Sequence, residues 1–235
     1  MSWREFWNAD TTIFANARHQ EIHCRAIAGD ILRLLPRSGM RVLDFGCGDA
    51  LCADEIADCC GKLVLCDAAA TVRKRLIARF GSLANVVVTS PELAEQTSDV
   101  AFDLIIVNSV VQYFDRTEFD KWLGIWRRML LPNGQLILGD VVPPNVGQLR
   151  DAHELLRFAR RNGFLTAAMT GVVRTYFSSY RTTRAQAGFL RFDEQELIEL
   201  VRRSGFAAMR LGKNLGHNSA RLAFIASPLQ GLTAA

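Results

Sequence analysis

The sequence lacks long apolar runs, and none approaches the ~18 consecutive apolar residues of a membrane-spanning helix. Its first seven residues include Arg4 and Glu5 and lack the apolar core of a signal peptide. With 49% hydrophobic residues among 235, the chain can bury a sizeable core, which argues against global disorder. These features predict a single cytoplasmic domain.

Paired cysteines of the Cys-x-x-Cys type are also missing. The six cysteines, at positions 24, 47, 52, 59, 60 and 66, do not have the spacing of a zinc site, so we expect reduced thiols and no bound metal.

Lysine is absent from residues 145–190, where seven arginines against one Asp and one Glu give a net charge of +5. Since the whole chain carries only +4, the basic character belongs to this segment.

Short apolar segments alternate with helical patterns from residue 40 to residue 140. Strands are predicted at 40–45, 63–66, 86–89, 102–107 and 135–138, with two more at 207–211 and 222–226. Helices are predicted at 27–35, 51–60, 71–81, 117–130 and 193–205, and one or two short ones within 1–20. This alternation predicts an α/β fold with a parallel, doubly wound sheet and helices on both faces.

Helix starts are marked by capping residues. Thr71 can cap the helix that follows it, and Thr117 with Asp120 suits a capping box. Asp193 and Glu196 form a second box, which begins the helix after residue 192. Residues 1–38 are expected to form an N-terminal helical flap, and residues 141–191 an insertion of about two arginine-rich helical stretches that covers the site as a lid.

A tight glycine turn follows the first strand, in the pattern Asp44-x-Gly46-x-Gly48. Glycine allows positive φ and close approach of the backbone to a ligand. A pyrophosphate suits this turn poorly, because the third glycine of the dinucleotide motif is absent and Asp44 and Asp49 would repel it by roughly 1–3 kcal/mol. Asp67, nineteen residues after Gly48, can accept bonds from two ribose hydroxyls. The pattern therefore indicates a cationic nucleoside without phosphate, such as S-adenosylmethionine.

These residues resemble the class I S-adenosylmethionine-dependent methyltransferases. The matching segments are 42–48, 66–67, 102–109 and 131–136. The resemblance implies a Rossmann-like seven-stranded sheet with an antiparallel last strand, and S-adenosylhomocysteine as the product. It places the cofactor against the glycine turn, the ribose on Asp67, the adenine beside Ser90-Pro91 and the methionine end or the acceptor near Asn108. The implied cofactor residues are Asp44, Phe45, Gly46, Cys47, Gly48, Asp67, Ala68, Ser90, Pro91, Asn108 and Ser109.

The sequence departs from the family pattern at three places. Ala50 replaces a further glycine, and Ser90-Pro91 replaces an acidic residue that contacts the adenine amino group, a role that Glu92 could take. The Asn-Pro-Pro-Tyr signature of base and amide methylation is absent after Asn108, which disfavours a nucleic-acid substrate.

Three residues are catalytic candidates. His217, in the loop before the last strand, can act as a general base or be an ordinary loop histidine. Asp140 can orient His217 or the acceptor, or simply cap a turn, and Tyr113 can line the pocket or pack beneath a helix. His19 and His23 lie on one helical face and either reach the methionine end of the cofactor or face solvent.

The basic insertion suits an acceptor with an anionic group on an apolar body, because arginine binds carboxylates and phosphates well. The predicted acceptor contacts are Arg157, Arg160, Arg161, Tyr176 and Asn218. The same segment also suits peripheral contact with an anionic membrane, or is a solvated basic face. The leading hypothesis is methyl transfer to a small or lipophilic acceptor, and the alternatives are a nicotinamide-dependent oxidoreductase and a catalytically silent S-adenosylmethionine-binding scaffold.

Overall fold

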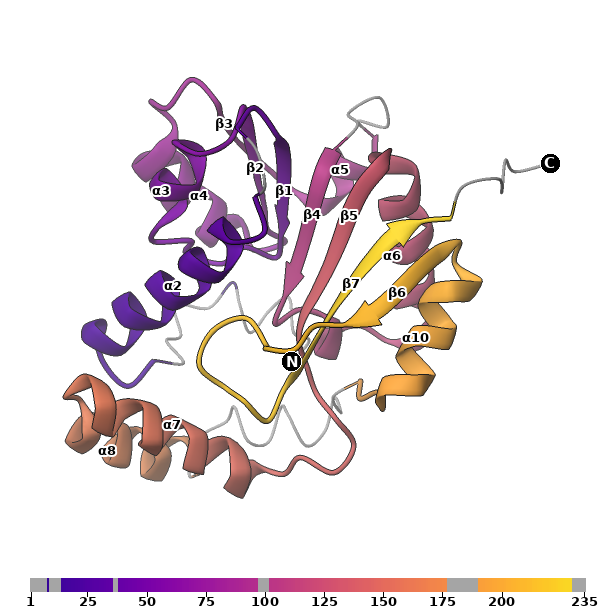
Figure 1. Cartoon of the computed structure of the whole chain (residues 1–235). Coiled ribbons are helices and arrows are strands. Elements are labelled where there is room, and N and C mark those ends of the chain that lie inside the picture. The colour runs from indigo at the N-terminus through magenta and orange to yellow at the C-terminus, as the bar shows by residue number, and fades with distance from the viewer. Residues whose placement is uncertain (1–7, 9–13, 36–37, 97–101, 177–189, 230–235) are drawn as a thin grey trace.

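The computed structural model describes residues 8, 14–35, 38–96, 102–176 and 190–229, and a seven-stranded sheet forms its centre (Figure 1). The strands are β1 (Arg41–Phe45), β2 (Lys62–Cys66), β3 (Val86–Thr89), β4 (Phe102–Asn108), β5 (Leu130–Val141), β6 (Phe206–Arg210) and β7 (Leu222–Pro228). Their order is β3-β2-β1-β4-β5-β7-β6, and only β7 runs antiparallel to its neighbours. The predicted sheet with an antiparallel last strand is confirmed.

Helices cover both faces of this sheet (Figure 1). They are α2 (Ala17–Leu32), α3 (Ala53–Ala57), α4 (Ala70–Phe80), α5 (Pro91–Gln96), α6 (Arg116–Met129), α7 (Gln148–Asn162), α8 (Leu165–Tyr176) and α10 (Glu194–Arg203), with a short 3-10 turn, η1 (Val111–Tyr113). The central strands are apolar and buried on both faces: the paired residues Leu43 and Ile105 pack on one side of the sheet, and the paired residues Val42 and Leu104 pack on the other. The apolar faces of α6 and α10 cover one side of the sheet, and those of α2, α3 and α4 cover the other.

Two of the predicted helix starts are wrong by one or two residues. Thr71 lies inside α4, whose N-cap is Ala69. Helix α6 is capped by Asp115, whose carboxylate accepts the backbone N–H of Glu118 at 2.7 Å, so the helix begins before the predicted capping box at Thr117. In α6, both Asp115 and Thr117 are residues that can cap a helix, and the earlier of the two is the one that does so. Helix α4 begins without a side-chain cap. The cap at Asp193 is confirmed.

Strand β5 and helices α2 and α3 differ in length from the prediction. The predicted turn at 132–134 lies within β5, where the register with β4 shifts between the partners of Phe102 and Leu104. Helix α2 starts at Ala17, earlier than predicted, and Asn16 caps it by accepting the His19 N–H at 2.8 Å. Helix α3 is shorter than the predicted 51–60. The prediction for residues 1–13 lies outside the described residues, except at Asn8.

The insertion after β5 forms the two predicted helices, α7 and α8, which pack together beside the N-terminal part of α2 (Figure 1). Arg18 of α2 donates to the carbonyl of Asn162 at the end of α7, at 2.9 Å. Phe164, between the two helices, is buried and stacks on His19 with ring centroids 5.0 Å apart. Within the described ranges, no helix has the length and apolar character required to span a bilayer.

Candidate active site

A cleft of about 480 Å³ opens at the carboxyl ends of β1, β2 and β4, the edge at which parallel α/β sheets bind ligands. Helix α2 closes its other side with Gln20, His23, Cys24 and Ile27. Of the predicted site residues, those in the cleft are Asp44, Phe45, Gly46, Cys47, Gly48, Asp67, Ala68, Pro91, Asn108, Ser109 and Tyr113. Ser90 is buried beside them, and its hydroxyl accepts the backbone N–H of Leu93 at 3.4 Å.

The glycine turn folds back on the end of β2. The backbone N–H groups of Gly46 and Cys47 donate to the carbonyl of Cys66 at 2.7 and 3.1 Å. Gly46 and Gly48 have φ values of +73° and +58°, which glycine adopts without strain. A Cβ on Gly46 would also collide with Cγ2 of Val110, whereas a Cβ on Gly48 would meet nothing within 4 Å. Both positions therefore favour glycine because of their positive φ. Gly46 favours it for a second reason, since any side chain there would collide with Val110.

Asp67 holds the turn and retains capacity for a ligand. Its carboxylate accepts the backbone N–H groups of Gly48 at 3.0 Å and Ala69 at 2.8 Å. An ionised carboxylate offers about four lone-pair positions, so about two remain for donors from the cleft. Burial raises the pKa of Asp67, while these two N–H groups and nearby Arg73 oppose the shift. The remaining positions match a pair of adjacent hydroxyl donors.

Asp44 is a partly exposed carboxyl in the wall of the cleft. Burial, followed by the charge of Asp67, raises its pKa to about 7. Two carboxyl groups this close favour a ligand that brings positive charge, because a cation relieves their repulsion and favours ionised Asp44.

The charge of Asp49 is compensated, which the sequence interpretation did not foresee. Its carboxylate forms an ion pair with Arg75 at 2.8 Å and accepts the side-chain N–H of Gln20 at 2.9 Å. Arg79 donates to its carbonyl at 2.8 Å. Asp49 thus joins α2 and α4 across the turn. No sequence signal marked Gln20 or Arg75, since their partner is 29 and 26 residues away.

Strain and an unpaired polar atom occur where β4 ends. Oδ1 of Asn108 is buried and has no hydrogen-bond partner among the described residues. Ser109 and Asp140 have φ values of +61° and +55°, although neither is glycine. The Ser109 hydroxyl donates to Asp140 at 2.9 Å, and the Asp140 N–H donates to the Asn214 side chain at 2.9 Å. Such strain is typical of a functional site.

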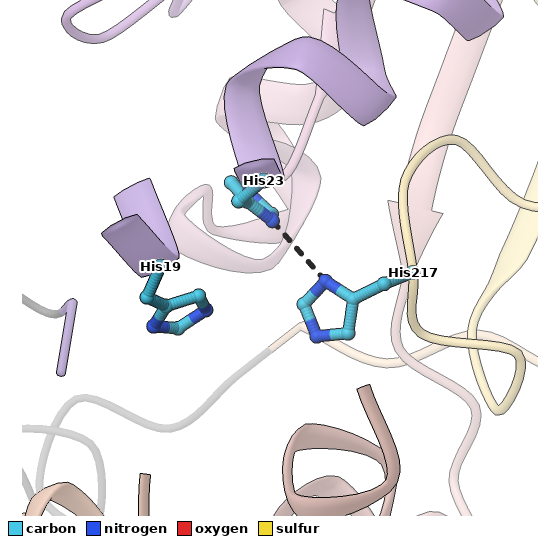
Figure 2. Close-up of side chains that lie close together, drawn as sticks. All are labelled: His19, His23 and His217. Atoms are coloured by element: carbon cyan, nitrogen blue, oxygen red, sulfur yellow. Dashed lines mark hydrogen bonds between the residues drawn. The ribbon is translucent and has the colours of Figure 1, made fainter. Parts of the chain in front are cut away.

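The structure does not bring the predicted Asp140–His217 pair together. Asp140 bonds to Ser109 and Asn214, and burial is the main cause of its raised pKa. His217 instead lies with its Nδ1 3.2 Å from Nδ1 of His23 (Figure 2). Its ring also stacks on Phe158, with centroids 4.2 Å apart. His23, rather than His217, lines the cleft. The sequence interpretation placed His23 on the flap but did not foresee its contact with His217.

The predicted acceptor contacts lie apart from the cleft. Arg157, Arg160 and Arg161 are exposed on α7, and none of them lines the cleft. Asn218 instead donates to Asp151 of α7 at 3.2 Å. The side chain of Tyr176 lies outside the described part of the chain.

A buried ion pair ties α7 to the loop between β6 and β7. Arg221 donates to both carboxylate oxygens of Asp151, at 3.1 and 2.7 Å, and its side chain is only 8% exposed. The insertion therefore packs on the loop of His217 as well as on α2. His153 is exposed on the same helix.

Residues 43–136 match a family model described as a methyltransferase domain. Nodulation protein S from Rhizobium tropici is 26% identical over 141 residues, which are 59% of this chain and 56% of that protein. The match thus spans little more than half the length of this curated relative.

Solved structures with the same fold cover nearly the whole chain. The DhpI–SAH complex has a TM-score of 0.62 at 16% identity, over 96% of this chain and 95% of DhpI. Magnesium protoporphyrin IX methyltransferase (ChlM) from Synechocystis PCC 6803 with SAH has a TM-score of 0.59 at 15% identity, over 95% and 92%. The N-methyltransferase NodS from Bradyrhizobium japonicum WM9 with SAH has a TM-score of 0.57 at 17% identity, over 94% and 93%.

Proposed function

We propose that this chain, whose residues 43–136 match a methyltransferase-domain family model, is a class I methyltransferase that binds S-adenosylmethionine and transfers its methyl group to a small-molecule acceptor. The observation that carries the proposal is the pair of carboxyl groups, Asp44 and Asp67, in one cleft with the glycine turn. Together they favour a cationic ligand with a hydroxyl pair and disfavour a pyrophosphate.

The residues of the cleft fit this cofactor. A volume of about 480 Å³ is in the range of small-molecule sites. Asp67 retains acceptor capacity for the ribose hydroxyls, and Pro91 offers an apolar surface to the adenine. Asp44 suits the ammonium of the methionine part, because its carboxylate accepts hydrogen bonds. Arg75 could attract a phosphate, but its charge is already paired with Asp49.

When bound, S-adenosylmethionine supplies a methyl group whose bond to sulfur breaks as the acceptor's lone pair forms the new bond, and the sulfur retains the bonding electrons. The chain contributes mainly position and exclusion of water. Oriented binding can supply roughly 7–11 kcal/mol of a reaction barrier. Helix α2 closes the cleft through the Gln20–Asp49 bond, and Phe14, Phe114 and Trp122 give it apolar walls that disfavour water near the reacting atoms.

A small acceptor is supported by the form of the site and by the similar proteins. The cleft is lined largely by apolar and aromatic side chains, which suits a compact apolar body. NodS is described as an N-methyltransferase and ChlM as a magnesium protoporphyrin IX methyltransferase. The exposed Arg157, Arg160 and Arg161 are open to an anionic group on an acceptor that extends beyond the cleft.

The test is to incubate the purified chain with methyl-labelled S-adenosylmethionine and a cell extract, and to measure label in small-molecule, protein and nucleic-acid fractions. We expect label in the small-molecule fraction with the wild type and much less with Asp67→Ala at limiting cofactor. Asp58→Ala, which removes an exposed carboxylate at the end of α3, is the matched control and should retain transfer. Label in protein or nucleic acid alone would refute the acceptor class. Cofactor binding without any transfer would support the silent scaffold.

A further inference from the structure

Three of the four histidines in the chain converge at one end of the cleft, from segments far apart in sequence (Figure 2). His19 and His23 lie one turn apart on α2, and His217 comes from the loop between β6 and β7. One ring nitrogen of each lies within 4.8 Å of the other two. We propose that His19, His23 and His217 bind a divalent transition metal ion of the zinc class.

The spacing of His23 and His217 matches two ligands of one ion. Their Nδ1 atoms are 3.2 Å apart. Two nitrogens each about 2.0–2.1 Å from a tetrahedral zinc ion are separated by roughly 3.3 Å. Without an ion, the two nitrogens can share only one proton as donor and acceptor. A metal ion binds each imidazole in its neutral form, through a ring nitrogen that carries no proton.

His19 provides a third nitrogen that lacks a partner. Its ring is 6% exposed, and its Nε2 has no hydrogen-bond partner among the described residues. Nδ1 of His19 accepts the backbone N–H of Ala15 at 3.2 Å. Coordination through Nε2 requires the ring proton on Nδ1, so this contact must open as the ring moves toward the ion. Ala15 precedes α2 and is not held in its hydrogen-bond ladder, so the chain can adjust there.

The rings are held in place by their surroundings, as metal ligands usually are. Phe158 stacks on His217 at 4.2 Å and Phe164 on His19 at 5.0 Å. The loop of His217 is fixed to α2 by Asp30, which is buried and accepts the backbone N–H of Gly216 at 2.7 Å. This contact brings the two sides of the cluster together independently of any ion.

The local charge also suits a cation. Glu154 of α7 is buried, acts electrostatically on His217, and has Arg157 as an ion-pair partner at 3.8 Å, a long separation. The negative charge of the Glu154 carboxylate would stabilise a dication bound by the three neutral rings. Three histidines leave one position of a tetrahedral ion open, as in catalytic zinc sites. Since His23 lines the cleft, the proposed metal site lies at the edge of that cleft.

The test uses the full chain, stripped with a chelator and titrated with Co²⁺, with visible absorption as the readout and zinc competition for affinity. We expect about one ion per chain and a spectrum without the thiolate-to-metal charge-transfer band. His23→Ala and His217→Ala should each weaken binding at least about 100-fold, because loss of a direct ligand exceeds the 10–100-fold effect of outer-shell partners. The exposed His153→Ala is the matched control and should bind as the wild type does.

Three results would overturn the site: no stoichiometric Co²⁺ uptake by the wild type, a thiolate band indicating cysteine ligands, or unchanged binding in both histidine variants. Circular dichroism of each variant shows whether it is folded, and the wild-type titration stands without any variant. None of these readouts depends on methyl transfer, so failure of the metal site and failure of the proposed function remain distinguishable.

Discussion

Gly46 and Gly48 lie two residues apart in the same turn, and replacing each with alanine separates two physical effects. Both have positive φ, +73° and +58°, so alanine is strained at either position. Only at Gly46 does the added Cβ collide with a neighbour, the Cγ2 of Val110, with the Cβ and Cγ1 of Val110 at 3.4 Å. Gly48→Ala therefore measures backbone strain, and Gly46→Ala measures strain plus overpacking.

The magnitudes follow from these two terms. A non-glycine residue in the left-handed region costs roughly 1–2 kcal/mol, which is the expected loss for Gly48→Ala. Overpacking adds about 1–3 kcal/mol, so Gly46→Ala should lose about 2–5 kcal/mol. Val110→Ala removes both methyl groups involved and should relieve the overpacking. The Gly46→Ala and Val110→Ala changes should then be coupled by about 1–3 kcal/mol in the favourable direction.

The assay is urea unfolding of the wild type, the three single variants and the Gly46→Ala/Val110→Ala double variant, with the free energy of unfolding from linear extrapolation. A second cycle with Gly48→Ala in place of Gly46→Ala should show little coupling to Val110. Equal losses for the two glycine variants, or additive effects at Gly46 and Val110, would refute the packing argument. S-adenosylhomocysteine affinity, measured on the same proteins, should fall most for Gly46→Ala, because the displaced backbone is the one that faces the ligand.

Three further predictions concern charged groups. Because the folded pKa of Asp44 is raised to about 7, the wild type should lose stability as pH rises from about 4 to 7. The free energy of unfolding of Asp44→Asn should therefore exceed that of the wild type by up to about 4 kcal/mol at pH 8, and by less at lower pH. The variant should also bind S-adenosylmethionine more weakly, and unfolding and binding are compared at pH 5 and 8. Arg221→Ala should destabilise by up to about 3–5 kcal/mol because it removes both charge-assisted bonds to the partly buried Asp151, whereas Arg25→Ala, at an exposed pair, should cost under about 1 kcal/mol; equal losses in denaturation would contradict this difference. Alanine at the three arginines of α7 (Arg157, Arg160 and Arg161) should raise the KM for the acceptor and leave S-adenosylhomocysteine affinity unchanged, and an equal loss of both would exclude a role in acceptor binding.

Local patterns in the sequence were enough to predict the sheet and the glycine turn. The strands contain short apolar runs, and Asp193 caps α10 by a bond to a residue three positions away. In both cases the residues that form the sequence pattern are also the residues that form the element. The glycine turn and Asp67 were likewise predicted because parallel strands bring their carboxyl ends to one edge. Helix starts were missed where two capping residues compete within a few positions, as at Asp115 and Thr117.

Contacts between distant segments could not be predicted in the same way. Gln20 and Arg75 meet at Asp49 only after α2 and α4 have packed around the turn. His23 and His217 are 194 residues apart, and nothing in the spacing of either indicates the other. The same applies to Arg221 and Asp151, which determine where the insertion packs. Composition predicted a basic insertion, but its position relative to the cleft depends on these long-range pairs.

The most direct test of the central claim is calorimetric titration of the purified chain with S-adenosylhomocysteine and, separately, with NADH. The account predicts binding of S-adenosylhomocysteine on the order of 1 μM, about −8 kcal/mol, at one site per chain, at least about tenfold weaker binding by Asp67→Ala, and no comparable binding of NADH. Tighter binding of NADH than of S-adenosylhomocysteine, or S-adenosylhomocysteine binding that does not depend on Asp67, would contradict it.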